Sequence, residues 1–255
     1  MPALRRTIKQ LTYALIVACL GVGMLLVLFA PIFRSRQPAQ PLPSAAPVAI
    51  RVESVDTVPH PGSIDIIARV RNPNPRAGVA EFVVTFILLD AQGQEVRRID
   101  EQTYLLPGSL NYIAALHVPL TVPITQVKVE LPSQPLFSTP PAALATPTFN
   151  SFPRELTTRT IGQATIEVQK GVVANTSTAG FRQVDITGVA FDAEGKVIGI
   201  GKTFIGQFKV GEQREFTLQW PKPAAGTARV IILPAANIFQ ADNILRTVGD
   251  PSQLR

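Results

Sequence analysis

One sequence pattern occurs twice in this chain, first from Val83 to Val96 and again from Val184 to Ile198. In each copy an apolar run rich in strand-forming residues ends in Asp-Ala-x-Gly, and further strand formers follow. Gly accepts the positive φ of a tight turn that joins two antiparallel strands. The repeat therefore predicts two copies of one β domain.

The first copy is predicted to span residues 48–131. Apolar and polar residues alternate in Ile50–Val55 and Ile64–Val70, as half-buried strands require. Asn72-Pro73-Asn74-Pro75 then interrupts strand pairing, because Pro lacks an N–H and restricts the residue before it. Together with the hairpin and three later apolar runs, these segments predict an immunoglobulin-like antiparallel β-sandwich of short strands.

The second copy is predicted over residues 158–234, as another immunoglobulin-like sandwich. Asn175-Thr176-Ser177 stands where Asn72-Pro73-Asn74 stands in the first copy. Val210-Gly211-Glu212 likewise parallels the predicted turn Pro107-Gly108-Ser109. The agreement of turns as well as strands favours true tandem repeats.

Pro-rich segments precede and separate the two predicted domains. Residues 34–47 are predicted to be an extended spacer, and residues 132–157 a Pro/Thr-rich linker that holds the domains apart, because such compositions cannot build a core. For the tail, residues 235–255, two alternatives remain: a short helix or strand docked on the second domain, or disorder.

An apolar segment at residues 11–33 carries no charge over 23 residues. As a helix it would extend roughly 34 Å, which exceeds the ~30 Å hydrocarbon core of a bilayer. We therefore predict one transmembrane helix. Leu28-Phe29-Ala30-Pro31 lacks the small residues of a signal-peptidase site, so the segment is expected to remain as a signal anchor. Ile16-Val17-Ala18-Cys19 resembles a lipobox, but membrane-compatible residues continue after Cys19, which favours the anchor over lipidation.

The charge distribution predicts orientation and excludes one class of partner. The net charge is +6, yet five of the 24 Lys and Arg residues flank the apolar segment, where no acid occurs, and the rest of the chain is nearly neutral. A nucleic-acid partner is therefore not expected. The small excess of positive charge before residue 11 and the N-terminal position of the segment predict a cytoplasmic stretch 1–10 in a single-pass cell-membrane protein. Residues 34–255 would then be extracytoplasmic.

Candidate chemical groups are few. His60 and His117 stand alone in the sequence, and Cys19 is the only cysteine, so no zinc or disulfide framework is expected. Asp90 and Asp192 recur at matched positions, but their loops lack the alternating ligands of a calcium loop and are read as turns.

Two further patterns are read as structural. Gly199-Ile200-Gly201-Lys202 resembles a phosphate-binding loop, but no helix follows it, so we interpret it as strand glycines at a bulge or sheet edge. Trp220, Phe208 and Phe216 are read as core aromatics. No catalytic, cofactor-binding or metal-binding residue is predicted, and no cofactor or small-molecule substrate is expected.

Part of the chain resembles known families. Asn175-Thr176-Ser177, Val189–Val197 and Val210-Gly211-Glu212 together look like the FxLYD domain, an extracytoplasmic β-sandwich, although Ala190 and Phe191 stand where that signature has Leu and Tyr. Arg71–Pro75 with the following valine-rich strand is similar to the late-embryogenesis-abundant type 2 (water-stress) β-sandwich. These resemblances imply modules that bind, space or scaffold.

The sequence thus predicts a non-enzymatic, membrane-anchored protein that presents two β-sandwiches outside the cytoplasm for protein interaction or envelope assembly. The bilayer would contact residues 11–33, and an unidentified protein partner would bind sheet edges or loops of the distal domain. Two alternatives remain open: an extracytoplasmic enzyme with a loop-built site, which needs a concave polar pocket, and a sensor or regulatory subunit that signals through a partner helix, with Gly21 and Gly23 at its contact.

Overall fold

The computed structural model describes residues 46–140, 147–162, 164–223 and 226–245. In this part of the chain the regular structure is antiparallel β-sheet with one short 3-10 turn, so the predicted all-β class is confirmed. Residues 1–45, with the predicted transmembrane helix 11–33, lie outside the described residues. Within the described ranges no helix is long and apolar enough to cross a bilayer.

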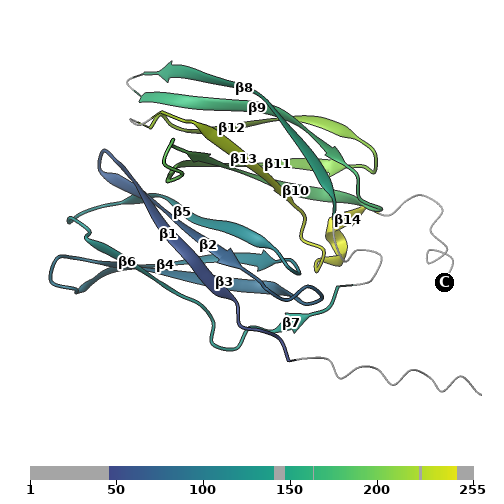
Figure 1. The fold of residues 1–255 in the computed structure, drawn as a ribbon, viewed down its shortest axis with the longest axis horizontal. Helices are drawn as coiled ribbons and strands as arrows, with labels where there is room; N and C mark the ends of the chain where they lie inside the picture. The colour runs from purple at the N-terminus through teal and green to yellow at the C-terminus, as the bar shows by residue number, and fades with distance from the viewer. Residues whose placement is uncertain (1–45, 141–146, 163, 224–225, 246–255) are drawn as a thin grey trace, which may run out of the picture. The chain divides into compact units, whose positions relative to one another are not determined.

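The first module contains seven strands in two sheets (Figure 1). They are β1 (Arg51–His60), β2 (Ser63–Arg71), β3 (Gly78–Leu89), β4 (Glu95–Leu105), β5 (Leu110–Pro119), β6 (Gln126–Glu130) and β7 (Phe137–Ser138). One sheet has the order β1-β2-β5; the other has the order β4-β3-β6, with β7 on the start of β3. Buried side chains of both sheets, such as Ile66, Phe82 and Phe86, form one core. Two sheets around one core are consistent with a β-sandwich.

The second module repeats this topology. Its strands are β8 (Phe149–Ile161), β9 (Ala164–Asn175), β10 (Gly180–Phe191), β11 (Val197–Phe208), β12 (Gln213–Pro221), β13 (Arg229–Ala235) and β14 (Ile244–Leu245). The sheets are β12-β9-β8 and β11-β10-β13, with β14 on the start of β10. Each pairing of the first module therefore recurs in the second, as the repeated sequence predicts.

The repeated hairpins have the predicted turns. Gly93 and Gly195 adopt φ of 75° and 82°. The Oδ1 atom of Asp90 accepts hydrogen bonds from the backbone N–H groups of Gln92 and Gln94, and Asp192 accepts one from Lys196 in the same way. Each Asp thus stabilises its own turn, which confirms the turn interpretation of both residues.

A buried asparagine occupies the same place in both modules. The Nδ2 of Asn72 donates to the carbonyls of Ala77 and Leu106. The Nδ2 of Asn175 donates to the carbonyls of Ala179, Phe208 and Lys209. Each side-chain oxygen accepts from the backbone N–H two residues on, at Asn74 and at Ser177. These bonds pair backbone groups where the chain leaves one sheet for the other.

Those asparagine turns also anchor the start of each module. Asn74 exchanges two hydrogen bonds with the backbone of Val48 at 2.7 Å. Ser177 does the same with the backbone of Thr148, at 2.8 and 3.0 Å. β8 therefore begins at Phe149, inside the stretch 132–157 that was predicted as linker, and β7 lies in that stretch too.

The two modules are packed together, which corrects the predicted separation. The described residues from 47 onward form one compact unit. Buried residues of both modules share one apolar cluster, here called the shared cluster: Val58, Ile67, Tyr112 and Ala114 of the first module with Val189, Phe191, Val197 and Ile200 of the second. Proline composition predicted a spacer, but the apolar outer faces of two sheets are removed from water by covering each other.

The described part of the tail is docked, which settles the choice between docking and disorder up to Leu245. Ile244 and Leu245 pair with Phe181 and Gly180 as β14, and Ile238 is buried in the core of the second module. A 3-10 turn, η2 (Ala241–Asn243), precedes this strand. Residues 246–255 lie outside the described residues.

Candidate functional site

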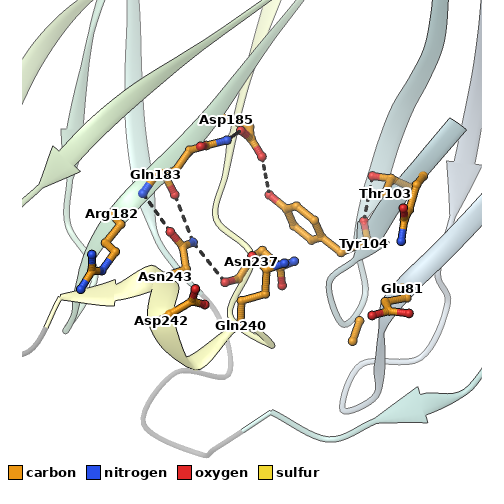
Figure 2. A pocket seen from close by; sticks show the side chains of 12 residues that line it. Glu81, Thr103, Tyr104, Arg182, Gln183, Asp185, Asn237, Gln240, Asp242 and Asn243 are labelled. Carbon is orange, nitrogen blue, oxygen red and sulfur yellow. Dashed lines mark hydrogen bonds between the residues drawn. The ribbon is translucent and has the colours of Figure 1, made fainter.

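A polar hollow of about 560 Å³ lies between the first module and the second (Figure 2). It is lined by side chains from β3, β4, β10 and the docked tail: Ala80, Glu81, Gln102, Thr103, Tyr104, Arg182, Gln183, Asp185, Asn237, Gln240, Asp242 and Asn243. This is the kind of concave polar pocket that the enzyme alternative requires. Its chemical capacity depends on how many of these groups are free.

Tyr104 and Asp185 join the two modules across this hollow. The Tyr104 hydroxyl donates to Asp185 Oδ2 at 3.2 Å, and Gln183 Nε2 donates to the other oxygen, Oδ1, at 2.7 Å. Burial, and then the negative charge of Asp185 and this hydrogen bond, raise the pKa of Tyr104 well above its usual range. The phenol therefore stays protonated at neutral pH, and its role here is that of a hydrogen-bond donor.

Lys202 makes a second polar contact between the modules. Its Nζ donates to the backbone carbonyl of Ala114 at 3.2 Å, which links β11 to β5. The side chain of Lys202 is exposed over part of its surface. The removal of water from the ammonium group by nearby protein atoms lowers its pKa, and the negative charges of Glu101 and Asp185 oppose that effect. The contact thus reinforces the packing of the shared cluster.

Asn243 fastens the tail beside the hollow. Its Oδ1 accepts from the Gln183 N–H at 2.8 Å, and its Nδ2 donates to the carbonyls of Gln183 and Asn237. Figure 2 shows the hydrogen bonds that join Asn243 to Gln183 and Asn237, and the one between Tyr104 and Asp185. Most of the central polar groups of the hollow are thus hydrogen-bonded to one another. These hydrogen bonds hold the two modules and the tail together.

The outer edge of β8 is a different kind of candidate site. β8 is the last strand of the sheet β12-β9-β8, and it lies at the outside of the second module in Figure 1. Three of its large apolar side chains are exposed: Phe152 by 53%, Leu156 by 39% and Ile161 by 61%. An edge strand offers unpaired N–H and C=O groups to another strand.

The edge of β4 offers a contrast within the same chain. β4 carries Glu95, Arg97, Arg98, Asp100 and Glu101, and Arg98 pairs with Glu95 and with Glu130 at 3.2 and 2.9 Å. Dense charge of this kind protects an edge from pairing with other chains. β8 has three charged residues along its whole length, Arg154, Glu155 and Arg159, so it is the less protected of these two edges.

The structure brings the only two histidines together around a buried carboxylate. His60 Nε2 lies 2.9 Å from Asp65 Oδ2, and the His117 backbone N–H donates to Asp65 Oδ1 at 2.6 Å. The two rings stack 6.0 Å apart. In the described part of the chain no group of three or more His, Cys, Asp or Glu residues could hold a metal ion. Asp65 instead fixes His117 at a β-bulge, where its φ is 52°.

The glycine-rich stretch is confirmed as strand. Gly199 and Gly201 lie in β11, an edge strand of its sheet. A Cβ at Gly199 would come within 2.6 Å of the Trp220 ring, and one at Gly201 within 2.7 Å of the Gln219 carbonyl. The glycines are therefore required by the close approach of β12, and Lys202 beyond them contacts the first module.

The predicted core aromatics are also confirmed. Trp220, Phe208 and Phe216 are buried in one apolar cluster. The indole N–H of Trp220 donates to Glu167 Oε2 at 2.9 Å, and the Thr227 hydroxyl donates to the same oxygen at 2.5 Å. The buried Glu167 thus holds Trp220 and Thr227 in place in the second module. Asp65 has a similar role in the first module, where it holds His117.

No protein-family model matches the sequence, and no curated protein matches it.

Proposed function

We propose that this chain is a non-enzymatic, single-pass membrane protein whose two immunoglobulin-like modules bind another protein outside the cytoplasm. The anchor would be residues 11–33 and the spacer residues 34–47, both argued from the sequence. The FxLYD and late-embryogenesis-abundant type 2 resemblances support a binding or scaffolding role. The observation that carries the proposal is the open outer edge of β8 with its three exposed apolar side chains.

The packing of the modules supports presentation of that edge. The shared cluster and the Tyr104–Asp185 hydrogen bond join the module that carries β8 to the module that follows the spacer. A partner bound at β8 would therefore meet a body of fixed geometry, which reduces the entropy lost on binding.

Capture of bound protein from solubilised membranes tests the proposal, with the full-length chain as bait. The test variant is Leu156→Lys, which places a charge on the exposed stretch of β8. The matched control is Val122→Lys, because Val122 is an apolar residue of similar exposure, 43%, on a loop of the first module. We expect a bound protein, whether a different chain or a second, differently tagged copy of this one, to be lost with Leu156→Lys and retained with Val122→Lys. Equal binding by both variants would contradict the proposal.

The polar hollow favours a second candidate, an enzyme or a receptor for a small polar ligand. It would use the side chains of the hollow that face solvent, such as Arg182 and Gln240. Turnover or binding of a panel of polar small molecules by the wild-type chain, abolished by Arg182→Ala, would support this candidate. The mutual hydrogen bonding of Tyr104, Asp185, Gln183 and Asn243 makes it the weaker of the two.

A further inference from the structure

The stretch of β8 from Glu155 to Ile161 pairs regularly with β9 on its inner side. Glu155 lies opposite Lys170, Thr157 opposite Val168, and Arg159 opposite Ile166. We propose that the outer side of this stretch pairs with β8 of a second copy of the chain, antiparallel, with Thr157 opposite Thr157 of that copy. This inference rests on the proposed function, because it names the partner of the same edge.

Strand geometry restricts the registers that such a pair can adopt. Along an edge strand the outward-pointing backbone groups belong to every second residue, and a ladder forms only if outward residues face outward residues. For two copies of one strand related by a two-fold axis, the axis must therefore pass through a residue. A register whose axis falls between two residues would place outward groups against inward ones.

Charge selects one of the remaining registers. With the axis at Thr157, Glu155 lies opposite Arg159 of the second copy, and Arg159 lies opposite its Glu155. With the axis at Leu156 or at Thr158, Glu155 and Arg159 each lie opposite an uncharged residue. The symmetric arrangement centred on Thr157 thus gains two cross-strand ion pairs, which stabilise antiparallel pairing.

The existing contacts of these residues leave room for the new pairs. Glu155 Oε2 lies 3.5 Å from Lys170 Nζ on the neighbouring strand, and both side chains are about half exposed. Arg159 makes no ion pair with any of the described residues. In the paired state Glu155 would lie between Lys170 and the second copy's arginine, so its charge would be balanced from both sides.

The apolar residues fit the same register. Leu156 lies opposite Thr158 of the second copy, which brings the two Leu156 side chains into diagonal contact across the axis. A β-bulge between Pro153 and Glu155 in the ladder with β9 ends the regular stretch of β8 at Glu155. The interface is therefore short, and we expect a reversible dimer that confinement to one membrane strengthens.

A disulfide placed on the symmetry axis tests this geometry in the full-length chain. In a Cys19→Ser background, Thr157→Cys brings two new thiols opposite each other, and mild oxidation with copper phenanthroline in native membranes should give a covalent dimer. Thr160→Cys is the matched control, because the two residues 160 lie three positions from the axis in opposite directions, so their thiols cannot meet. A dimer from Thr157→Cys and little from Thr160→Cys is the expected result.

Charge exchange provides a second readout that does not depend on cysteine geometry. Glu155→Arg and Arg159→Glu each create like-charge pairs, and we expect each to lower the dimer affinity about tenfold or more. The double variant restores opposite charges in both pairs and should recover dimer formation, measured by co-purification of two differently tagged copies. If Thr157→Cys gives no dimer and the single exchanges change nothing, the self-pairing is wrong.

The capture experiment with Leu156→Lys distinguishes the two possible failures. If Thr157→Cys gives no dimer but Leu156→Lys still removes a different bound protein, self-pairing is overturned and the proposed function stands with that partner. If neither variant has an effect, both are overturned.

Discussion

Ile66 and Ile67 are consecutive residues of β2, both fully buried, and their side chains lie in different apolar clusters. Ile66 lies in the core of the first module, whereas Ile67 lies in the shared cluster between the modules. A strand of an isolated sandwich would bury one of these positions and expose the other. Burial of both shows that the second module covers the outer face of this sheet.

Truncation of these two neighbours should have different consequences. Ile66→Ala and Ile67→Ala should each lower the free energy of unfolding by about 2–5 kcal/mol, because each leaves a cavity. Ile67→Ala should also weaken the coupling between modules, so that calorimetry shows a broader or divided transition. Ile66→Ala should leave a single transition. Two separate transitions in the wild-type protein would contradict the shared cluster.

Tyr104 should make stability depend on alkaline pH. Its pKa is raised in the folded protein, first by burial and then by Asp185, so the unfolded chain releases the phenol proton first as pH rises. The stabilising contribution is complete below the unfolded pKa of about 10 and is lost as pH rises above it. Tyr104→Phe should remove this part of the decline in unfolding free energy at alkaline pH.

The measurement is the difference in unfolding free energy between wild type and Tyr104→Phe from pH 8 to pH 11. Other alkaline groups, such as Lys202, remain in both proteins and largely cancel. We expect the wild type to be more stable by about 1 kcal/mol at pH 8, the size of a typical hydrogen bond. The difference should shrink above pH 10, and a difference that grows there would contradict the assignment.

Asn72 and Asn175 should be equally important for their modules. Replacement of either by Ala leaves buried carbonyls and an N–H without partners, and we expect a loss of about 2–4 kcal/mol. The exposed Asn150 is the control, and Asn150→Ala should change stability by less than about 0.5 kcal/mol. Chemical denaturation followed by circular dichroism measures all three. A small effect at one buried site alone would contradict their equivalence.

Gly199 should tolerate no side chain, because the Trp220 ring lies against it. Gly199→Ala should cost about 1–3 kcal/mol through overpacking. Gly206 is a matched control on the same strand, since a Cβ there would meet the Arg182 carbonyl at an ordinary 3.7 Å. The fluorescence of Trp220, the only tryptophan, reports unfolding of both variants. Equal stability of the two would argue against the close packing of β11 and β12.

The local features of the fold were predictable from the sequence. The Asp90 and Asp192 turns depend on glycines a few residues away, and the asparagine turns depend on short segments that recur in both halves. Strand boundaries were less accurate. β4 is one continuous strand, but the polar residues in its middle weaken the apolar signal from which its length could be predicted.

The packing between modules was not predicted, because it depends on contacts far apart in the sequence. Tyr104 and Asp185 are separated by 81 positions, and neither lies in a recognisable motif. One signal was present: Ile66-Ile67-Ala68 and Val197-Ile198 place apolar residues at consecutive positions, which indicates burial on both faces of a strand. The prolines at 132–153 suggested a linker, although β7 and the start of β8 lie there.

The central claim, that the outer edge of β8 binds another strand, is tested most directly by amide-resolved hydrogen exchange. The full-length protein would be compared in its native membrane and at high dilution in detergent. On a free edge, alternate amides between Glu155 and Ile161 exchange quickly, because they lack partners. We predict that these amides become protected in the membrane, to the level of the neighbouring β9. Persistence of fast alternate amides in the membrane would contradict the claim.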